Sequence, residues 1–172
     1  VEKNINLLAD VKNKKISELS ACILNRPRHK EIVDKLKKLN VRINFITDGD
    51  IAGALSVIGE KSKNDIYYST GGGPEGVIVA AALSCYGGQI QGRLVLNNEE
   101  KMRAKKLGIK NFDKKYNIED MIKGDVIFCA TGVTSGDLAT GVKDLGNEYE
   151  VNTFVLHKSQ NIIKSVTNIY NK

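Results

Sequence analysis

The chain has 172 residues, of which 41% are apolar and 27% charged, and its formal net charge is +6. A chain of this size and composition is typical of one globular domain that buries its own hydrophobic core. Its apolar runs fall well short of the roughly 20 residues that a membrane-spanning helix needs, so a membrane-spanning protein is excluded and we expect no membrane partner. The three cysteines form no Cys-x-x-Cys pair, so we expect a reducing, cytoplasmic location. The sequence begins at Val1 without methionine or an apolar signal region, and we expect a piece of a longer protein.

Positive charge is concentrated in two segments. Residues 1–44 carry 11 Lys or Arg against 5 Asp or Glu, and residues 101–124 carry 8 against 3. Both basic runs lie in amphipathic helical patterns without interleaved aromatics, which favours solvated helix faces over a nucleic-acid surface. We therefore predict no nucleic-acid partner, whereas an anionic small molecule would suit the positive field.

From Ser20 onward, short apolar runs alternate with helical periodicity, a pattern typical of the α/β class. We expect a mostly parallel or mixed sheet covered by helices on both faces, with residues 1–19 as a helical lead-in and 20–172 as one α/β lobe. The predicted strands are 21–24, 41–46, 65–69, 89–96, 125–130, 151–157 and 162–169, and the predicted helices are 30–39, 51–58, 75–86, 99–107 and 118–122. The last two strands predict an antiparallel hairpin at a sheet edge.

Three polar loops follow predicted parallel strands. They are Asn25-Arg26-Pro27-Arg28, Thr47-Asp48-Gly49-Asp50 and Thr70-Gly71-Gly72-Gly73-Pro74-Glu75-Gly76. Ligands of open α/β sheets bind beyond the carboxyl ends of the strands, so these loops are the candidate site. The glycine run before Pro74 predicts an anion cradle of free amides at a helix start, or else a tight strand-to-helix turn without a ligand.

The charged residues of these loops each allow two interpretations. Asp48 and Asp50 have the spacing to bind two sugar hydroxyls or a divalent cation, and paired carboxylates also suit acid–base catalysis. Asp50 could equally be the N-cap of the following helix. Arg26 and Arg28 flank Pro27 in a way that suits a phosphate, although two solvent-facing charges would look the same. His29 is expected at the surface, and no residue is assigned as catalytic.

Five motifs, in this order, resemble those of bacterial class II fructose-1,6-bisphosphatases: Arg26-Pro27-Arg28-His29, Asp48-Gly49-Asp50, Gly71-Gly72-Gly73-Pro74-Glu75-Gly76, Gln91-Gly92-Arg93-Leu94 and Ala130-Thr131-Gly132-Val133-Thr134-Ser135-Gly136-Asp137. The resemblance covers nearly the whole chain and identifies it with the C-terminal half of such an enzyme. It implies the fold of the lithium-sensitive phosphatase superfamily, and Gly73 departs from the alanine usual in that family.

The resemblance also implies roles for individual residues. Arg26, Pro27 and Arg28 would contact a substrate phosphate, and Gly72 would meet the ligand through its backbone. Asp48, Gly49 and Asp50 would hold sugar hydroxyls, and Glu75 would supply one ligand to a catalytic Mn²⁺ or Mg²⁺. The implied reaction is hydrolysis of the phosphate at carbon 1 of fructose 1,6-bisphosphate, or of sedoheptulose 1,7-bisphosphate, by metal-activated water in gluconeogenesis. The complete enzyme is expected to be a cytoplasmic homo-oligomer.

The principal metal motif of that superfamily begins with Asp-Pro, whereas Pro27 and Pro74 follow Arg26 and Gly73. The N-terminal metal-binding lobe is therefore expected to be absent, and a divalent cation held by Glu75 alone would bind weakly. We predict that this chain by itself is inactive as a phosphatase. The alternative is a stand-alone, non-catalytic module that binds or senses a sugar phosphate.

Overall fold

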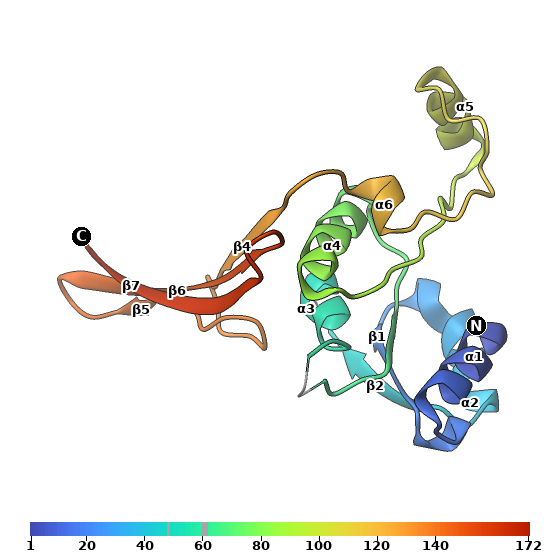
Figure 1. The fold of residues 1–172 in the computed structure, drawn as a ribbon, viewed down its shortest axis with the longest axis horizontal. Coiled ribbons are helices and arrows are strands. Elements are labelled where there is room, and N and C mark those ends of the chain that lie inside the picture. The colour runs from blue at the N-terminus through green and yellow to red at the C-terminus, as the bar shows by residue number, and fades with distance from the viewer. Residues whose placement is uncertain (48, 60–61) are drawn as a thin grey trace. The chain divides into compact units, whose positions relative to one another are not determined.

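The computed structural model describes residues 1–47, 49–59 and 62–172, and they form two compact units, Val1–Glu75 and Gly76–Lys172. The first unit holds a parallel sheet and the second an antiparallel one (Figure 1). The α/β class and the mixture of parallel and antiparallel pairing are confirmed.

The first unit is built on a three-stranded parallel sheet in the order β2-β1-β3. Its strands are β1 (Ser20–Leu24), β2 (Arg42–Ile46) and β3 (Ile66–Tyr68). Its helices are α1 (Glu2–Lys12), α2 (Lys30–Lys38) and α3 (Asp50–Leu55), with short 3₁₀ turns η1 (Ile16–Glu18) and η2 (Pro27–His29). The first three predicted strands are therefore confirmed, and residues 1–19 contain the helix α1 and the turn η1.

The central strand β1 is buried along its whole length, which explains its unbroken apolar run. Ala21 faces a core to which α1 contributes Ile5 and α2 contributes Leu36, each fully buried. Helix α3 packs on β1 and β3, and a Cβ on its Gly53 would press against Ile46 and Tyr67. Helices thus cover both faces of this sheet, as the sequence predicts (Figure 1).

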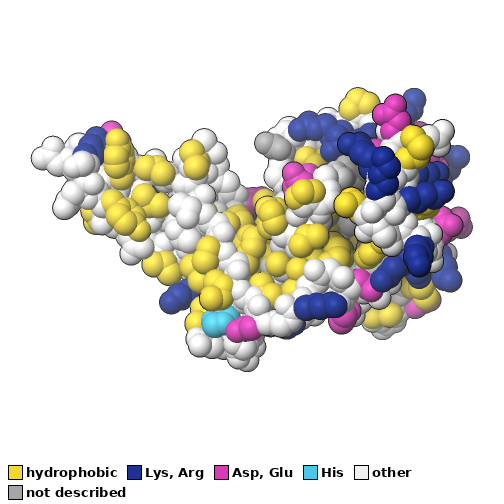
Figure 2. Space-filling model, turned by 90° about the horizontal axis from the view of Figure 1, so that it is seen from above, with side chains coloured by type: hydrophobic (Ala, Val, Ile, Leu, Met, Phe, Trp, Pro, Cys, Tyr) yellow, Lys and Arg dark blue, Asp and Glu magenta, His cyan; other side chains and the backbone are white. Residues whose placement is uncertain are grey.

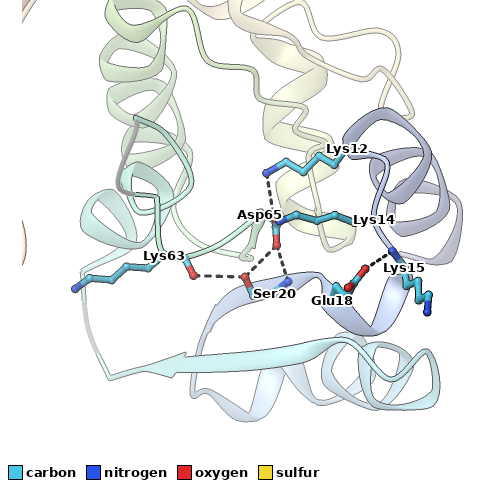
Figure 3. A network of polar contacts seen from close by, with 7 residues as sticks. All are labelled: Lys12, Lys14, Lys15, Glu18, Ser20, Lys63 and Asp65. Atoms are coloured by element: carbon cyan, nitrogen blue, oxygen red, sulfur yellow. Dashed lines mark hydrogen bonds and ion pairs between the residues drawn. The ribbon is translucent and has the colours of Figure 1, made fainter.

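A buried carboxylate fastens the start of β3 to the start of β1 and to the end of α1. The Asp65 carboxylate accepts hydrogen bonds from the Ser20 amide at 2.8 Å and from its hydroxyl at 3.1 Å. The ammonium groups of Lys12 and Lys14 lie 2.7 and 3.0 Å from the same carboxylate (Figure 3). Its side chain is only 7% exposed, so these pairs are screened less than surface ion pairs.

The second unit ends in an antiparallel sheet in which β6 (Glu148–His157) pairs with β4 (Ile127–Thr131), β5 (Lys143–Asp144) and β7 (Ile162–Asn171). Strands β6 and β7 form the predicted C-terminal hairpin, and β7 is an edge strand. The helices are α4 (Gly73–Tyr86), α5 (Asn98–Lys106) and α6 (Ile118–Met121). The Tyr86 ring at the end of α4 stacks on Phe154 of β6, with ring centroids 6.4 Å apart.

One expectation for this unit is wrong. Residues 89–96 form no strand and contribute one isolated bridge, between Gly92 and Tyr116. The error arises because an alternating apolar pattern does not say which segment pairs with it. Helix α4 is confirmed, and it leaves Val77 and Ile78 more than two-fifths exposed.

The basic helices are solvated, as expected. The cationic side chains of α5 are exposed, and Figure 2 shows Lys and Arg side chains spread over the right of the view. On the left of the same view, hydrophobic side chains gather over the C-terminal sheet, whose exposed members include Ile163, Ile169 and Tyr170. In the described part of the chain, every helix is too short or too polar to cross a bilayer.

The Asp65 contacts predict a stability effect that an exposed ion pair lacks. Replacing Asp65 with Asn removes a charged acceptor from four donors, so we expect the free energy of unfolding to fall by about 1.5–3 kcal/mol in urea titrations. Glu31→Gln is the control, because it removes only the exposed pair with Lys35 on α2, which water and salt screen, and it should cost far less stability. Equal losses in the two variants would contradict this assignment.

The same carboxylate predicts a pH dependence. Partial burial pushes the pKa of Asp65 upward, but the hydrogen bonds from Lys12, Ser20 and Lys14 outweigh it and hold the pKa well below its usual range. A depressed carboxyl pKa stabilises the fold above the unfolded-state value of about 3.9 and loses that contribution as pH falls toward the folded-state value. The stability difference between wild type and Asp65→Asn should therefore be constant above about pH 5 and shrink below about pH 4. Urea titrations across this range measure it.

Candidate functional site

Three loops meet at one edge of the parallel sheet because β1, β2 and β3 run in the same direction. Residues 25–29 follow β1, residues 47–50 follow β2, and residues 69–75 follow β3. All of the predicted site residues belong to these loops and to the first compact unit. The arrangement is the one in which open α/β sheets bind their ligands.

The arginine segment, residues 25–29, turns sharply after β1. Pro27 begins the 3₁₀ turn η2, and the Arg26 amide donates to the carbonyl of Leu24 at 2.9 Å. Among the described residues, the exposed Arg26 side chain makes one hydrogen bond, of 3.3 Å, to the neighbouring Asn25 carbonyl. Arg28 reaches across to the next loop, where its Nε donates to the Thr70 carbonyl at 2.5 Å. The segment therefore presents one guanidinium to solvent and anchors the other.

His29 is fully buried, so the expectation that it lies at the surface is wrong. Its Nδ1 lies 2.8 Å from the Leu24 carbonyl, and its Nε2 lies 2.9 Å from the Thr70 amide. The ring fills the space between the end of β1 and the start of the glycine loop. A signal was present in the sequence, since His29 directly continues the Arg26-Pro27-Arg28 run, but a single sequence gives no sign of its burial.

Asp50 is the first residue of α3, following Gly49, which has a φ of 86° that glycine adopts without strain. Asp50 is therefore not the N-cap. Its Oδ1 accepts hydrogen bonds from the Tyr67 hydroxyl and the Ser69 hydroxyl, both at 2.6 Å. A Cβ on Gly71 would lie 3.4 Å from the other carboxylate oxygen, which places this oxygen beside the glycine loop.

Tyr67 and Ser69 are site residues that the sequence analysis did not predict. They stand two apart on and just after β3, so their side chains point to the same face of the sheet. Burial raises the pKa of Tyr67 well above its usual range, and the Asp50 carboxylate raises it further. The tyrosine is therefore a neutral donor that fixes the orientation of Asp50.

The glycine loop, residues 69–75, runs directly into α4. Gly73 is the first helical residue, with Pro74 next and the exposed Glu75 in the first turn. The Glu75 carboxylate folds back over Gly72, where a Cβ would overlap it. Gly72 and Glu75 are thus adjacent in space, whereas Asp48 lies outside the described residues.

The motif at residues 130–137 lies in the second unit and has a structural explanation of its own. A Cβ on Gly132 would overlap the Thr140 carbonyl, and one on Gly141 would press on the backbone of Thr134 and Ser135. The buried Asn152 supports this compact loop, since its side-chain oxygen accepts from the Thr140 amide at 3.2 Å.

One cluster contains the residue types of a hydrolase triad without its geometry. Asp125 and the Ser159 hydroxyl both lie against Nε2 of His157, at 2.8 and 3.3 Å, and Ser159 donates to Asp125 at 2.6 Å. A triad needs the carboxylate on one ring nitrogen and the hydroxyl on the other. The contacts from Ser159 and His157 lower the pKa of Asp125, and the cluster clamps the β6–β7 turn to the start of β4.

Comparison with known proteins decides the family. A family model described as bacterial fructose-1,6-bisphosphatase, glpX-encoded, matches residues 1–170. The chain belongs to this family. It is 33% identical to a protein of Synechococcus sp. strain JA-2-3B'a(2-13) and 32% identical to one of Synechocystis sp. strain PCC 6803, both named D-fructose 1,6-bisphosphatase class 2/sedoheptulose 1,7-bisphosphatase. Each match covers 99% of this chain and 53% of the relative, so the chain spans about half the length of those proteins.

The divalent cation implied by this fructose-1,6-bisphosphatase family does not fit the donors at hand. The described residues hold no group of three or more His, Cys, Asp or Glu side chains placed to bind a metal ion. At the glycine loop, Glu75 offers one carboxylate, whereas Mg²⁺ and Mn²⁺ need several oxygen ligands. Within the described ranges, the site is therefore equipped to bind an anion and hydroxyl groups, and its metal centre is incomplete.

The Tyr67–Asp50 hydrogen bond predicts a contrast between two adjacent tyrosines. Tyr67→Phe leaves a carboxylate with one donor fewer and should lower the free energy of unfolding by about 1–3 kcal/mol. Tyr68→Phe is the matched control, because its hydroxyl lies 3.5 Å from the neutral Val1 carbonyl at the start of the chain, and its loss should be about 1 kcal/mol or less. Chemical denaturation of the two variants measures the difference, and a larger loss for Tyr68→Phe would contradict it.

Proposed function

We propose that this chain is the substrate-binding part of a metal-dependent class II fructose-1,6-bisphosphatase. One observation carries the proposal: the arginine segment, Asp50 and the glycine loop converge at one edge of a parallel sheet, and Arg28 and His29 bind the first and third loops together at Thr70. The family membership and the names of the relatives support the substrate class.

Each part of the site suits one part of a sugar bisphosphate. The exposed Arg26 guanidinium and the terminal nitrogens of Arg28 supply the forked cationic donors that bind phosphate. Asp50 offers an acceptor for a sugar hydroxyl, already oriented by Tyr67 and Ser69, and Gly49 and Asp48 belong to the same proposed contact. Gly72 lets the ligand approach the backbone closely because it lacks a Cβ.

Hydrolysis of the phosphate ester requires more than the described residues supply. Mn²⁺ or Mg²⁺ would polarise the phosphate and activate water in the whole protein, with Glu75 as one ligand among others held elsewhere. What this chain contributes is recognition: its arginines attract the anion, and its aspartate fixes the sugar. We therefore propose that the 172-residue chain binds the substrate but does not hydrolyse it.

The sugar is fructose 1,6-bisphosphate in this proposal, and the relatives' names also include a sedoheptulose bisphosphatase. The contacts proposed for the arginines and Asp50 reach a phosphate and nearby hydroxyls, which the two sugars share. The role in gluconeogenesis, the cytoplasmic location and the assembly of whole enzymes into homo-oligomers belong to the same proposal.

Calorimetric titration of the chain with fructose 1,6-bisphosphate tests it. We expect Arg26→Ala to weaken binding about tenfold, the loss of one charge-assisted contact. Little loss of stability is expected, because the side chain is exposed and, among the described residues, hydrogen-bonds only the adjacent Asn25 carbonyl. Arg42→Ala is the control, since Arg42 is also exposed but begins β2 and so lies at the opposite edge of the sheet.

Two results would overturn the proposal. Absence of binding by the wild-type chain, or equal weakening by Arg26→Ala and Arg42→Ala, would remove the assigned phosphate site. Phosphate release by the chain at an ordinary enzymatic rate with Mn²⁺ or Mg²⁺ would show that its metal centre is complete after all. Phosphate is measured colorimetrically in the same samples.

A further inference from the structure

We infer that His29, to which the proposed function assigns no contact with the substrate, is a positioning residue: as a neutral imidazole it locks the arginine segment and the glycine loop into one anion-binding unit. The inference rests on the proposed function for its consequence, weaker binding of a sugar bisphosphate, but its geometric part stands without it. His29, itself in the arginine segment, is fully buried and contacts the Leu24 carbonyl at the end of β1 and the Thr70 amide in the glycine loop.

The contacts fix which ring nitrogen carries the proton. A backbone amide can only donate, so the 2.9 Å contact from the Thr70 amide requires Nε2 to be an unprotonated acceptor. A carbonyl can only accept, so the 2.8 Å contact at Nδ1 requires a proton there, donated to Leu24. The distance of 3.4 Å from Nε2 to the Thr70 carbonyl is then no hydrogen bond. The ring is therefore the neutral Nδ1–H tautomer.

The arginine segment hydrogen-bonds both the backbone amide and the backbone carbonyl of Thr70. His29 accepts from the Thr70 amide, and Arg28 donates its Nε to the Thr70 carbonyl at 2.5 Å. These two bonds join positions 41 and 42 residues apart in the chain. Gly71 and Gly72 follow immediately, so the pair of bonds sets where the glycine amides lie relative to the Arg28 guanidinium.

This linkage matters because the glycine run has the most conformational freedom of the three loops. Without the link, binding an anion would have to order the glycines at the moment of contact, and that ordering would weaken the affinity. With His29 in place, the order exists before the ligand arrives. Arg28 alone is a poorer anchor, because its side chain is exposed and rotates about several bonds.

Two substitutions separate positioning from space filling. Gln at position 29 can bring a side-chain oxygen to the place of Nε2 and keep the Thr70 bond, whereas Asn can bring its amide to the place of Nδ1 and keep only the Leu24 bond. A purely structural role would make His29→Gln and His29→Asn equivalent for ligand binding. The positioning role makes Gln the rescuing variant.

The first measurement uses the wild-type chain labelled with ¹⁵N-histidine. NMR should show a pyrrole-like Nδ1 and a pyridine-like Nε2 for His29, and slow hydrogen exchange of the Thr70 amide. A protonated Nε2, whether in the other tautomer or in imidazolium, would overturn the inference, as would rapid exchange of that amide. This measurement needs no ligand and no variant.

The second measurement is titration of the three proteins with fructose 1,6-bisphosphate. We expect His29→Asn to raise the dissociation constant about tenfold or more and to speed exchange of the Thr70 amide, and His29→Gln to stay within about threefold of wild type. Equal losses in both variants would overturn the positioning role. If wild type fails to bind at all, the proposed function falls, while the tautomer and amide exchange still decide whether His29 holds the loops together.

Discussion

The burial of one strand, β1, is the constraint on which the site depends. All five of its residues are buried, with β2 and β3 paired in parallel on its two sides. Parallel pairing is what brings residues 25–29, 47–50 and 69–75 to a single edge, because each loop leaves the same end of its strand. Asp65 secures this arrangement from the opposite edge, where it joins the starts of β3 and β1. The site is thus a consequence of strand direction, and the loops themselves need little regular structure.

The sequence predicts the elements better than it predicts their partners. Alternating and helical apolar patterns locate β1, β2, β3, α2 and the terminal hairpin, since burial imposes those periods on one segment at a time. Residues 89–96 alternate in the same way but form only one bridge, at Gly92, because a strand also needs a neighbour of matching length. The apolar surface of α4 likewise predicts a helix and leaves open what covers Val77 and Ile78.

The site shows the same division between local and distant information. Its charged and glycine residues are visible in the sequence because they interrupt apolar strands with side chains that suit an anion. His29 and Tyr67 are not visible, because their roles depend on contacts with Thr70 and Asp50, 41 and 17 residues away. A histidine and a tyrosine are common in cores, so residue type alone could not separate them from packing.

Recognition and hydrolysis make different demands on a protein, and the function proposed for this chain involves only the first. An anion can be held by guanidinium groups and backbone amides from one sheet edge, whereas a divalent cation needs several oxygen ligands in a fixed geometry. Glu75 places one carboxylate beside Gly72 in the glycine loop. Without a cation, a phosphate would repel a carboxylate at this position. With a divalent cation bound to the phosphate, the carboxylate would be attracted to that cation. In the proposed function, the arginines bind the phosphate in this chain against that repulsion, and a divalent cation held in the whole protein would strengthen the binding.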